Sequence, residues 1–82
     1  MNIFEAYKKM MNGGKVTHKN LKEYCFNSLA EYKDYELYMK YCSYYKTIQF
    51  IGYKDGKEIV LTDGMELCFE EIMSNEWCDY VG

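Results

Sequence analysis

The side chains that could hold a ligand fall into a polar segment and an aromatic set. The polar segment carries several hydrogen-bond donors and consists of Lys15, Thr17, His18, Lys19 and Asn20. The aromatic set consists of Tyr44, Tyr45, Tyr53, Trp77 and Tyr80. Aromatic stacking and lysine contacts are ordinary means of gripping a nucleotide. The two groups together predict a site for an anionic, ring-bearing ligand, although core packing and surface solvation explain the same residues without one.

Catalysis is not expected, because the chain lacks the groups that general acid-base chemistry needs. His18 is the single histidine, and histidine is the usual proton-transfer group at neutral pH. It follows a Gly-Gly-Lys-Val-Thr stretch at an expected helix start, so we expect a surface residue there. Cys25 would lie about two helical turns away, too far for a Cys-His pair. We therefore predict no catalytic residues and no enzyme activity.

The cysteines are expected to be free, buried thiols. They are Cys25, Cys42, Cys68 and Cys78, an even number that also leaves disulfides and metal binding open. No two of them form a CxxC pair, and His18 is seven residues from the nearest cysteine. The start MNIFEAYKK lacks the apolar stretch of a signal peptide, which favours a reducing cytoplasm. We predict no metal and no cofactor.

Size and charge restrict the class of protein further. The 82 residues make one domain, 1–82, with 49% hydrophobic and 18% aromatic residues, a globular composition. A chain this small buries a modest core, so we expect a homo-oligomer. The net charge is −3 and every basic residue is lysine. Direct nucleic-acid binding is therefore not expected, since phosphate and guanine recognition favour arginine and a basic face. No transmembrane run is visible.

Two local structures are marked clearly. Asn2 and Glu5 form a capping pair for an N-terminal helix that Gly13 or Gly14 ends. Asp55-Gly56 is the preferred loop of a type I′ turn, which predicts a hairpin of about 47–53 and 57–62. The pairs expected about this turn are Phe50 with Leu61, Ile51 with Val60, and Gly52 with Ile59.

The remaining segments are predicted from periodicity. Lys15-Val16-Thr17 is expected to be a short strand or a linker. His18–Tyr45 has apolar residues at helical spacing and is predicted as a helical middle segment, either one helix or a helical hairpin. Asp63-Gly64-Met65-Glu66 opens a C-terminal helix, about 64–75, and Trp77–Val81 is a short final strand that could join the hairpin. The fold class predicted is a small, single-domain α+β fold.

Both ends of the chain resemble a group of small phage proteins. The N-terminal resemblance rests on Phe4-Glu5-Ala6 followed by Gly14-Lys15-Val16. The C-terminal resemblance rests on Met65-Glu66-Leu67 leading to the ending Asn75 through Val81. The chain departs from the group at Thr17-His18, where the group has Arg and then Trp, and in its middle segment, where strands are expected. The best described members are the Thoeris anti-defence sponges, with relatives that act as anti-CRISPR proteins.

The resemblance implies a phage counter-defence protein in the host bacterial cytoplasm. Thoeris anti-defence sponges sequester a cyclic ADP-ribose signal as oligomers, so the implied function is non-catalytic binding of a nucleotide immune signal. An anti-CRISPR relative implies the alternative, a protein–protein inhibitor of a bacterial defence effector. That inhibitor would use the acidic, Tyr-rich middle segment as its contact surface. The expected partner is accordingly a cyclic nucleotide or a host defence protein, with no membrane involved.

Overall fold

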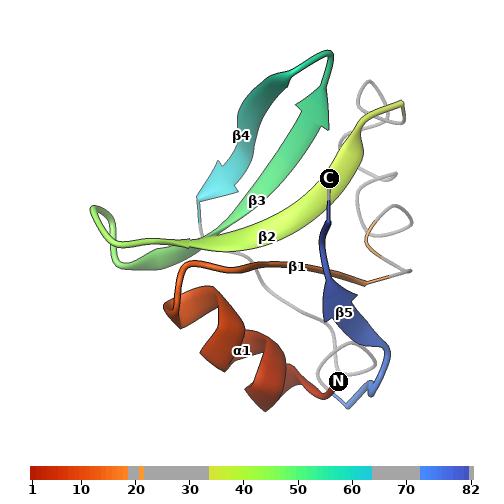
Figure 1. Cartoon of the computed structure of the whole chain (residues 1–82). Helices are drawn as coiled ribbons and strands as arrows, with labels where there is room; N and C mark the ends of the chain where they lie inside the picture. The colour runs from red at the N-terminus through yellow and green to blue at the C-terminus, as the bar shows by residue number, and fades with distance from the viewer. Residues whose placement is uncertain (19–20, 22–33, 64–72, 82) are drawn as a thin grey trace.

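The computed structural model of the chain describes residues 1–18, 21, 34–63 and 73–81. The elements within them are, in chain order, α1 (Ile3–Met11), β1 (Lys15–His18), β2 (Glu36–Cys42), β3 (Thr47–Lys54), β4 (Lys57–Asp63) and β5 (Trp77–Asp79). The strands form one antiparallel sheet in the order β4-β3-β2-β1-β5, with α1 beside β1 and β5 (Figure 1). The described fold is mostly β with one short helix, which corrects the helix-rich α+β fold predicted.

Helix α1 begins and ends where the sequence predicts. The Glu5 backbone N–H donates a hydrogen bond to the Asn2 side chain at 2.9 Å, and the Asn2 N–H donates to the Glu5 carboxylate at 3.1 Å. This capping box satisfies N–H groups that the first turn leaves unpaired. The chain leaves the helix through Gly13, whose φ of 89° is left-handed and suits a residue without a Cβ. The N-terminal helix is confirmed.

The hairpin of β3 and β4 is also confirmed. Asp55 and Gly56 have φ values of 54° and 78°, the two positive angles that a type I′ turn requires. Gly52 pairs with Ile59, as the turn predicts. The turn chemistry therefore sets the register close to the loop.

A β-bulge changes the register farther from the turn. Ile51 pairs with Val60 as predicted, but Phe50 pairs with Thr62 instead of Leu61. The register shifts between Phe50 and Ile51, because β4 carries Leu61 as an extra residue opposite them. Bulges bend a strand and increase its twist. The predicted pairing is thus right next to the loop and wrong by one residue beyond the bulge.

The predicted helical middle segment is wrong from Glu36 onward. Glu36–Cys42 is strand β2, and residues 43–46 form the turn into β3. Residues 19–20 and 22–33 of that segment lie outside the described residues. The physical reason is the alternation within β2, in which Leu37 and Met39 enter the core while Tyr38 and Lys40 face the other side. This period of two prevails over the helical spacing.

The C-terminal part differs from the prediction as well. The described residues show no C-terminal helix, since 73–75 form a turn and a bend and 64–72 lie outside the described part. A final strand is present as β5, but it pairs with β1, for example Thr17 with Cys78, and does not join the hairpin. Lys15–His18 is a strand and not a linker. The last strand therefore closes the edge of the sheet opposite β4.

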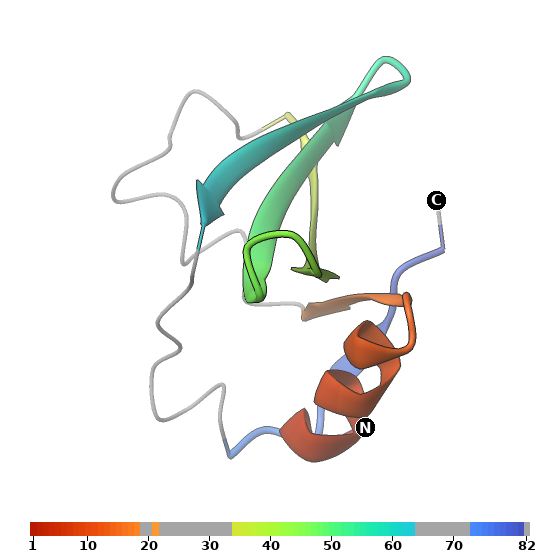
Figure 2. The same ribbon diagram turned by 90° about the vertical axis from the view of Figure 1, so that its left-hand side faces the viewer.

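The two faces of the sheet carry different residues. The covered face packs against Ala6 and Met10 of α1 and contributes Val16, Leu37, Met39, Phe50 and Trp77. The other face, called the tyrosine face from here on, contributes Lys15, Glu36, Tyr38, Lys40, Tyr53, Glu58 and Tyr80. Figure 2 shows α1 beside β1 and β5, with the hairpin reaching away from the helix. The end of the sheet near β5 thus has a helix on one face and the tyrosine cluster on the other.

Candidate functional site

A cavity opens where strands β1 and β2 separate. β1 pairs with β2 at Lys15 and Val16, whereas its pairing with β5 continues to His18. Beyond Val16, the Thr17 hydroxyl donates a hydrogen bond to the Leu37 carbonyl at 2.8 Å. The gap between the strands holds a cavity of about 380 Å³. Small-molecule pockets occupy about 300–1,000 Å³, so this cavity has the size for a small ligand.

The cavity lining combines apolar and acidic side chains. Leu21 and Leu37 contribute apolar surface, while Glu36, Glu76 and Tyr80 contribute polar groups. A carboxylate accepts hydrogen bonds and does not donate them. The lining therefore favours a flat apolar group that carries N–H donors, such as an amino-substituted ring, and disfavours an anion inside the cavity.

His18 forms part of the cavity wall from inside the protein. It is 3% exposed, which corrects the predicted surface position. Its Nε2 lies 2.7 Å from the Ser74 hydroxyl, and its ring meets the Trp77 ring edge-on with 4.9 Å between centroids. Trp77 is 1% exposed and belongs to the core. Both residues were predicted as ligand contacts. His18 lines the cavity, whereas Trp77 lies behind it and supports the His18 ring.

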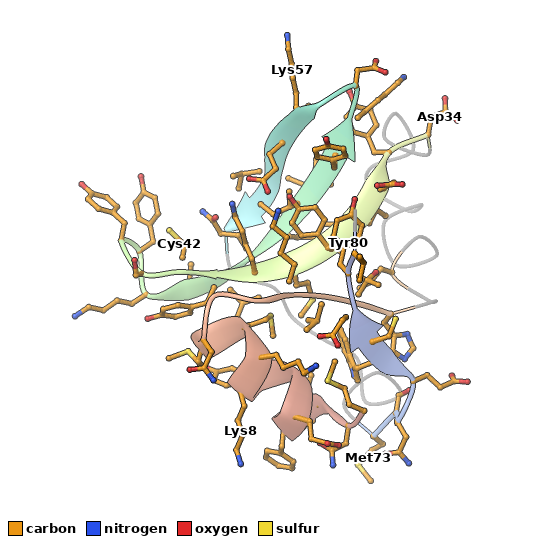
Figure 3. All side chains as sticks on the ribbon, viewed as in Figure 1. Lys8, Asp34, Cys42, Lys57, Met73 and Tyr80 are labelled. Atoms are coloured by element: carbon orange, nitrogen blue, oxygen red, sulfur yellow. The ribbon has the colours of Figure 1, made fainter. Side chains whose placement is uncertain are left out.

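Tyr80, labelled in Figure 3, lines the cavity and also belongs to the tyrosine face. Its ring stacks on Tyr38, with centroids 4.4 Å apart and ring planes 25° apart. Its backbone N–H donates to the Lys15 carbonyl at 2.9 Å, which continues the pairing of β5 with β1. Burial, and then the hydrogen bond from its hydroxyl to Glu36, raise the pKa of Tyr80 to about 12. The phenol is therefore a protonated donor at neutral pH.

A charged cluster adjoins this tyrosine stack. The Glu58 carboxylate accepts a hydrogen bond from the Tyr38 hydroxyl and one from Lys40 at 2.6 Å, and Lys15 lies 3.3 Å away. The Lys15 ammonium also lies 4.9 Å from the centre of the Tyr38 ring. The hydrogen bond from Lys40, followed by that from Tyr38, lowers the pKa of Glu58 to about 2. Burial, and then Glu58, raise the pKa of Tyr38.

The structure brings most of the predicted site residues together. Those in or beside the cavity are Lys15, Thr17, His18, Trp77 and Tyr80. Tyr53 lies on the same face, since it pairs with Glu36 of β2 and Glu58 of β4. Lys19 and Asn20 lie outside the described residues. Lys15, Tyr53 and Tyr80 thus lie on the tyrosine face. Trp77 belongs to the covered face, and His18 packs against it.

Several residues of this site were not predicted from the sequence. They are Glu36, Tyr38, Lys40 and Glu58. Glu36, Tyr38 and Lys40 occupy every second position of β2, so a strand interpretation would have placed all three on one face. Glu58 follows the Asp55-Gly56 turn closely enough for the hairpin to set it opposite Tyr53. The necessary signal was present in both cases, but the helical interpretation of the middle segment concealed the β2 residues, and with them the contacts of Glu58.

The thiols and the acidic groups show no metal site in the part of the chain that the structure describes. Cys42 is half-buried and Cys78 is exposed, and both are free; neither has the full burial predicted. Cys25 and Cys68 lie outside that part. No group of three or more His, Cys, Asp or Glu residues is placed to hold a metal ion within residues 1–18, 21, 34–63 and 73–81. None of the helices described there is long and apolar enough to cross a membrane.

No family model, curated protein or solved structure matches the chain. The cavity, the tyrosine stack and the charged cluster are therefore interpreted from their own geometry.

Proposed function

We propose that this chain is a phage counter-defence protein that binds a nucleotide immune signal without chemical change, as a homo-oligomer. The observation that carries the proposal is the cavity of about 380 Å³ lined by Tyr80, whose ring stacks on Tyr38, with the Lys15 ammonium over the Tyr38 ring. The terminal motifs Phe4-Glu5-Ala6 and Gly14-Lys15-Val16 supply the counter-defence context through their resemblance to anti-defence sponges.

The chemistry of the cavity suits the base of a nucleotide. A purine ring is flat and apolar, and its exocyclic amine can donate to the carboxylates of Glu36 or Glu76. The ring of Tyr80 borders the cavity and offers a stacking surface, and stacking is worth about 1–3 kcal/mol per base. Lys15, on the tyrosine face, supplies positive charge for the phosphate part of the ligand.

The shifted pKa values at the site fit a binding role. A general base at neutral pH needs a pKa near 7 and access to the substrate. The shifted groups of the described site move away from that range, Glu58 to about 2 and Tyr80 to about 12. His18 is buried, with its Nε2 against Ser74. Such a site can hold a ligand and return it intact.

Subunit association is supported by the outer surface of α1. Phe4 is 77% exposed and Tyr7 is 48% exposed. With Ile3 and Lys8 they line an open groove of about 450 Å³ that is almost entirely apolar. Large apolar side chains gathered on one surface are typical of protein contacts. A homo-oligomer that buries this groove would add to the modest core of a single chain.

Thermal-shift and calorimetric titration with cyclic ADP-ribose test the proposed function. A ligand that binds only the folded state raises the apparent melting temperature, and the shift grows with the logarithm of the ligand concentration divided by Kd. We expect Tyr80→Ala to weaken binding about tenfold or more, since it removes the stacking surface. Tyr44→Ala, at an exposed turn position, is the matched control and should bind normally. Absence of binding by the unaltered protein to cyclic ADP-ribose and to other cyclic nucleotides contradicts the proposal.

A second function is favoured by the turn between β2 and β3. Tyr44 and Tyr45 are 84% and 64% exposed and meet edge-on with 4.8 Å between ring centroids. Exposed tyrosines are enriched at the energetic centres of protein interfaces. This turn suits the alternative, a protein–protein inhibitor of a bacterial defence effector. Capture of one stoichiometric host protein that is lost with Tyr44→Ala and kept with Tyr80→Ala would support it over the nucleotide site.

A further inference from the structure

We propose that Lys15, Lys40 and the Tyr38 hydroxyl form a phosphate subsite. In the free protein this subsite is occupied by the protein's own Glu58 carboxylate, which a ligand phosphate displaces. The inference rests on the proposed nucleotide-binding function, which it extends by naming where the phosphate binds and what competes with it. None of these four residues except Lys15 was expected at the site.

The geometry of the cluster is that of a small anion site. Three donors from two strands converge on the two oxygens of Glu58: Lys40 at 2.6 Å, Lys15 at 3.3 Å, and the Tyr38 hydroxyl. A phosphate group offers oxygens with the same acceptor chemistry and carries at least the same negative charge. The donors that hold the carboxylate are therefore arranged to hold a phosphate group in its place.

The charges of the cluster leave room for a stronger anion. Lys15 and Lys40 carry two positive charges, and Glu58 supplies one negative charge to balance them. A phosphodiester would match the carboxylate, and a pyrophosphate would balance both lysines. Because the exchange replaces one anion by another, the buried Tyr38 hydroxyl keeps an acceptor and no donor is left without a partner.

Glu58 is positioned so that it can leave. It lies on β4, the edge strand of the sheet, where its backbone is held by pairing with Tyr53 of β3 and its side chain is 33% exposed. Exposed ion pairs contribute little to stability. Rotation of this side chain into solvent therefore costs little beyond the contacts that the incoming phosphate restores.

The subsite adjoins the cavity. Tyr38 stacks on Tyr80, which lines the cavity, and the Lys15 carbonyl accepts a hydrogen bond from the Tyr80 N–H. If the base of a nucleotide lies in the cavity, its phosphates would extend past Tyr80 to Lys15. The acidic cavity and the basic subsite thus separate the two ends of one ligand by charge.

The test measures the affinity of the full chain for cyclic ADP-ribose and for inorganic pyrophosphate by calorimetry. Glu58→Gln keeps the size of the side chain and removes the competing charge. The subsite is then free of its internal anion in a larger fraction of molecules, so we expect both ligands to bind about tenfold more tightly. Lys15→Gln and Lys40→Gln each remove a charged donor and should weaken both ligands about tenfold. Lys54→Gln is the matched control, because Lys54 lies over Tyr35, 5.4 Å from that ring centre, and is not among the donors to Glu58.

The outcomes separate this inference from the proposed function. If cyclic ADP-ribose binds and none of the three cluster variants changes its affinity relative to Lys54→Gln, the phosphate subsite is wrong while nucleotide binding stands. If pyrophosphate binding follows the predicted order but cyclic ADP-ribose binds no better than pyrophosphate, the subsite stands and the nucleotide function falls. Circular dichroism identifies any variant that fails to fold. Lys15→Gln and Lys40→Gln test two donors of the subsite separately, so the affinity of one variant can be checked against that of the other.

Discussion

The covered face of the sheet packs apolar side chains against α1, whereas the tyrosine face adds hydrogen bonds and ion pairs to its buried Tyr38 and Ile51. Trp77 and Met10 are 1% exposed on the first face. On the second, Tyr38 is also fully buried, but its hydroxyl is bound to the partly exposed carboxylate of Glu58. Apolar burial accounts for most of the stability of a fold, while exposed ion pairs contribute little. We therefore expect the covered face to provide most of the stability, and the proposed ligand exchange belongs to the tyrosine face.

The largest difference between the faces is expected from truncating one aromatic residue on each. Trp77→Ala removes the largest buried side chain of the described core and should lower the free energy of unfolding by about 3–5 kcal/mol. Tyr80→Ala, on the partly exposed face, should cost about 1 kcal/mol. Urea denaturation of both variants measures the two values. Equal losses would break the division between a stabilising face and a binding face.

A smaller effect is expected at the gap between β1 and β2. Thr17→Val keeps the shape of the side chain but removes the donor to the Leu37 carbonyl, which should cost about 1 kcal/mol. The same change leaves the cavity lining more apolar. Urea denaturation reports the loss, with Thr47→Val at the start of β3 as the control for a strand threonine. An unchanged midpoint for Thr17→Val would mean that water replaces the missing donor and that the gap is more open than the hydrogen bond suggests.

The charged cluster is expected to make a small, pH-dependent contribution. The pKa of Glu58 is lowered from 4.5 to about 2, so its stabilisation is present above the unfolded pKa and is lost as the pH falls from about 5 to about 2. Since the side chain is 33% exposed, the contribution at neutral pH is about 1 kcal/mol or less. Glu58→Gln should therefore be less stable than the unaltered protein at pH 7 and equally stable near pH 2. A difference that persists unchanged across this range would place the stabilisation outside the ionised carboxylate.

The smallest effect on the stability of a single chain is expected at the outer surface of α1. Phe4→Ser and Tyr7→Ser change exposed side chains and should alter the unfolding free energy of a monomer by about 0.5 kcal/mol or less. If the groove at this surface joins subunits, both changes reduce the mass measured by light scattering after size-exclusion chromatography. Tyr44→Ser tests whether loss of any exposed aromatic residue has the same result. A mass that is unchanged by Phe4→Ser and Tyr7→Ser would remove this surface from the assembly.

Local signals in the sequence were sufficient for the elements whose structure is set by their own residues. The Asn2 and Glu5 capping box and the Asp55-Gly56 turn both occur as predicted, because cap and loop residues act over a few positions of the chain. The bulge opposite Phe50 and Ile51, where β4 carries Leu61 as the extra residue, was not predictable in this way. It depends on how β3 and β4 bend across the whole sheet, and no single residue type marks it.

The middle of the chain shows how two periodicities can compete. Tyr35, Met39 and Cys42 fit helical spacing, while Leu37, Met39 and Tyr41 fit the alternation of a strand, and the structure follows the second pattern in β2. Pairing with β1 and β3 on both sides stabilises the strand, and those partners are distant in sequence. Local periodicity contains no information about such long-range pairing. The resemblance to the phage group, by contrast, implied strands in the middle segment.

Residue type indicated part of the candidate site but not its arrangement. Lys15, Thr17 and Tyr80 were selected from residue type alone, and they do meet at the cavity edge. Residue type did not show that His18 and Trp77 would be buried, because burial follows from the pairing of β1 with β5. Nor could it show the anionic partner of Lys15, since Glu58 comes from the opposite edge of the sheet.

The most direct measurement of the central claim is recovery of the ligand. The protein is incubated with cyclic ADP-ribose, separated from free ligand by filtration, denatured by heat, and the released compound is identified by chromatography and mass spectrometry. Non-catalytic sequestration predicts that intact cyclic ADP-ribose is retained by the unaltered protein and by Tyr44→Ala, and that much less is retained by Tyr80→Ala. Recovery of a linear or otherwise altered product, or equal retention by the two variants, would contradict the proposed site and its mechanism.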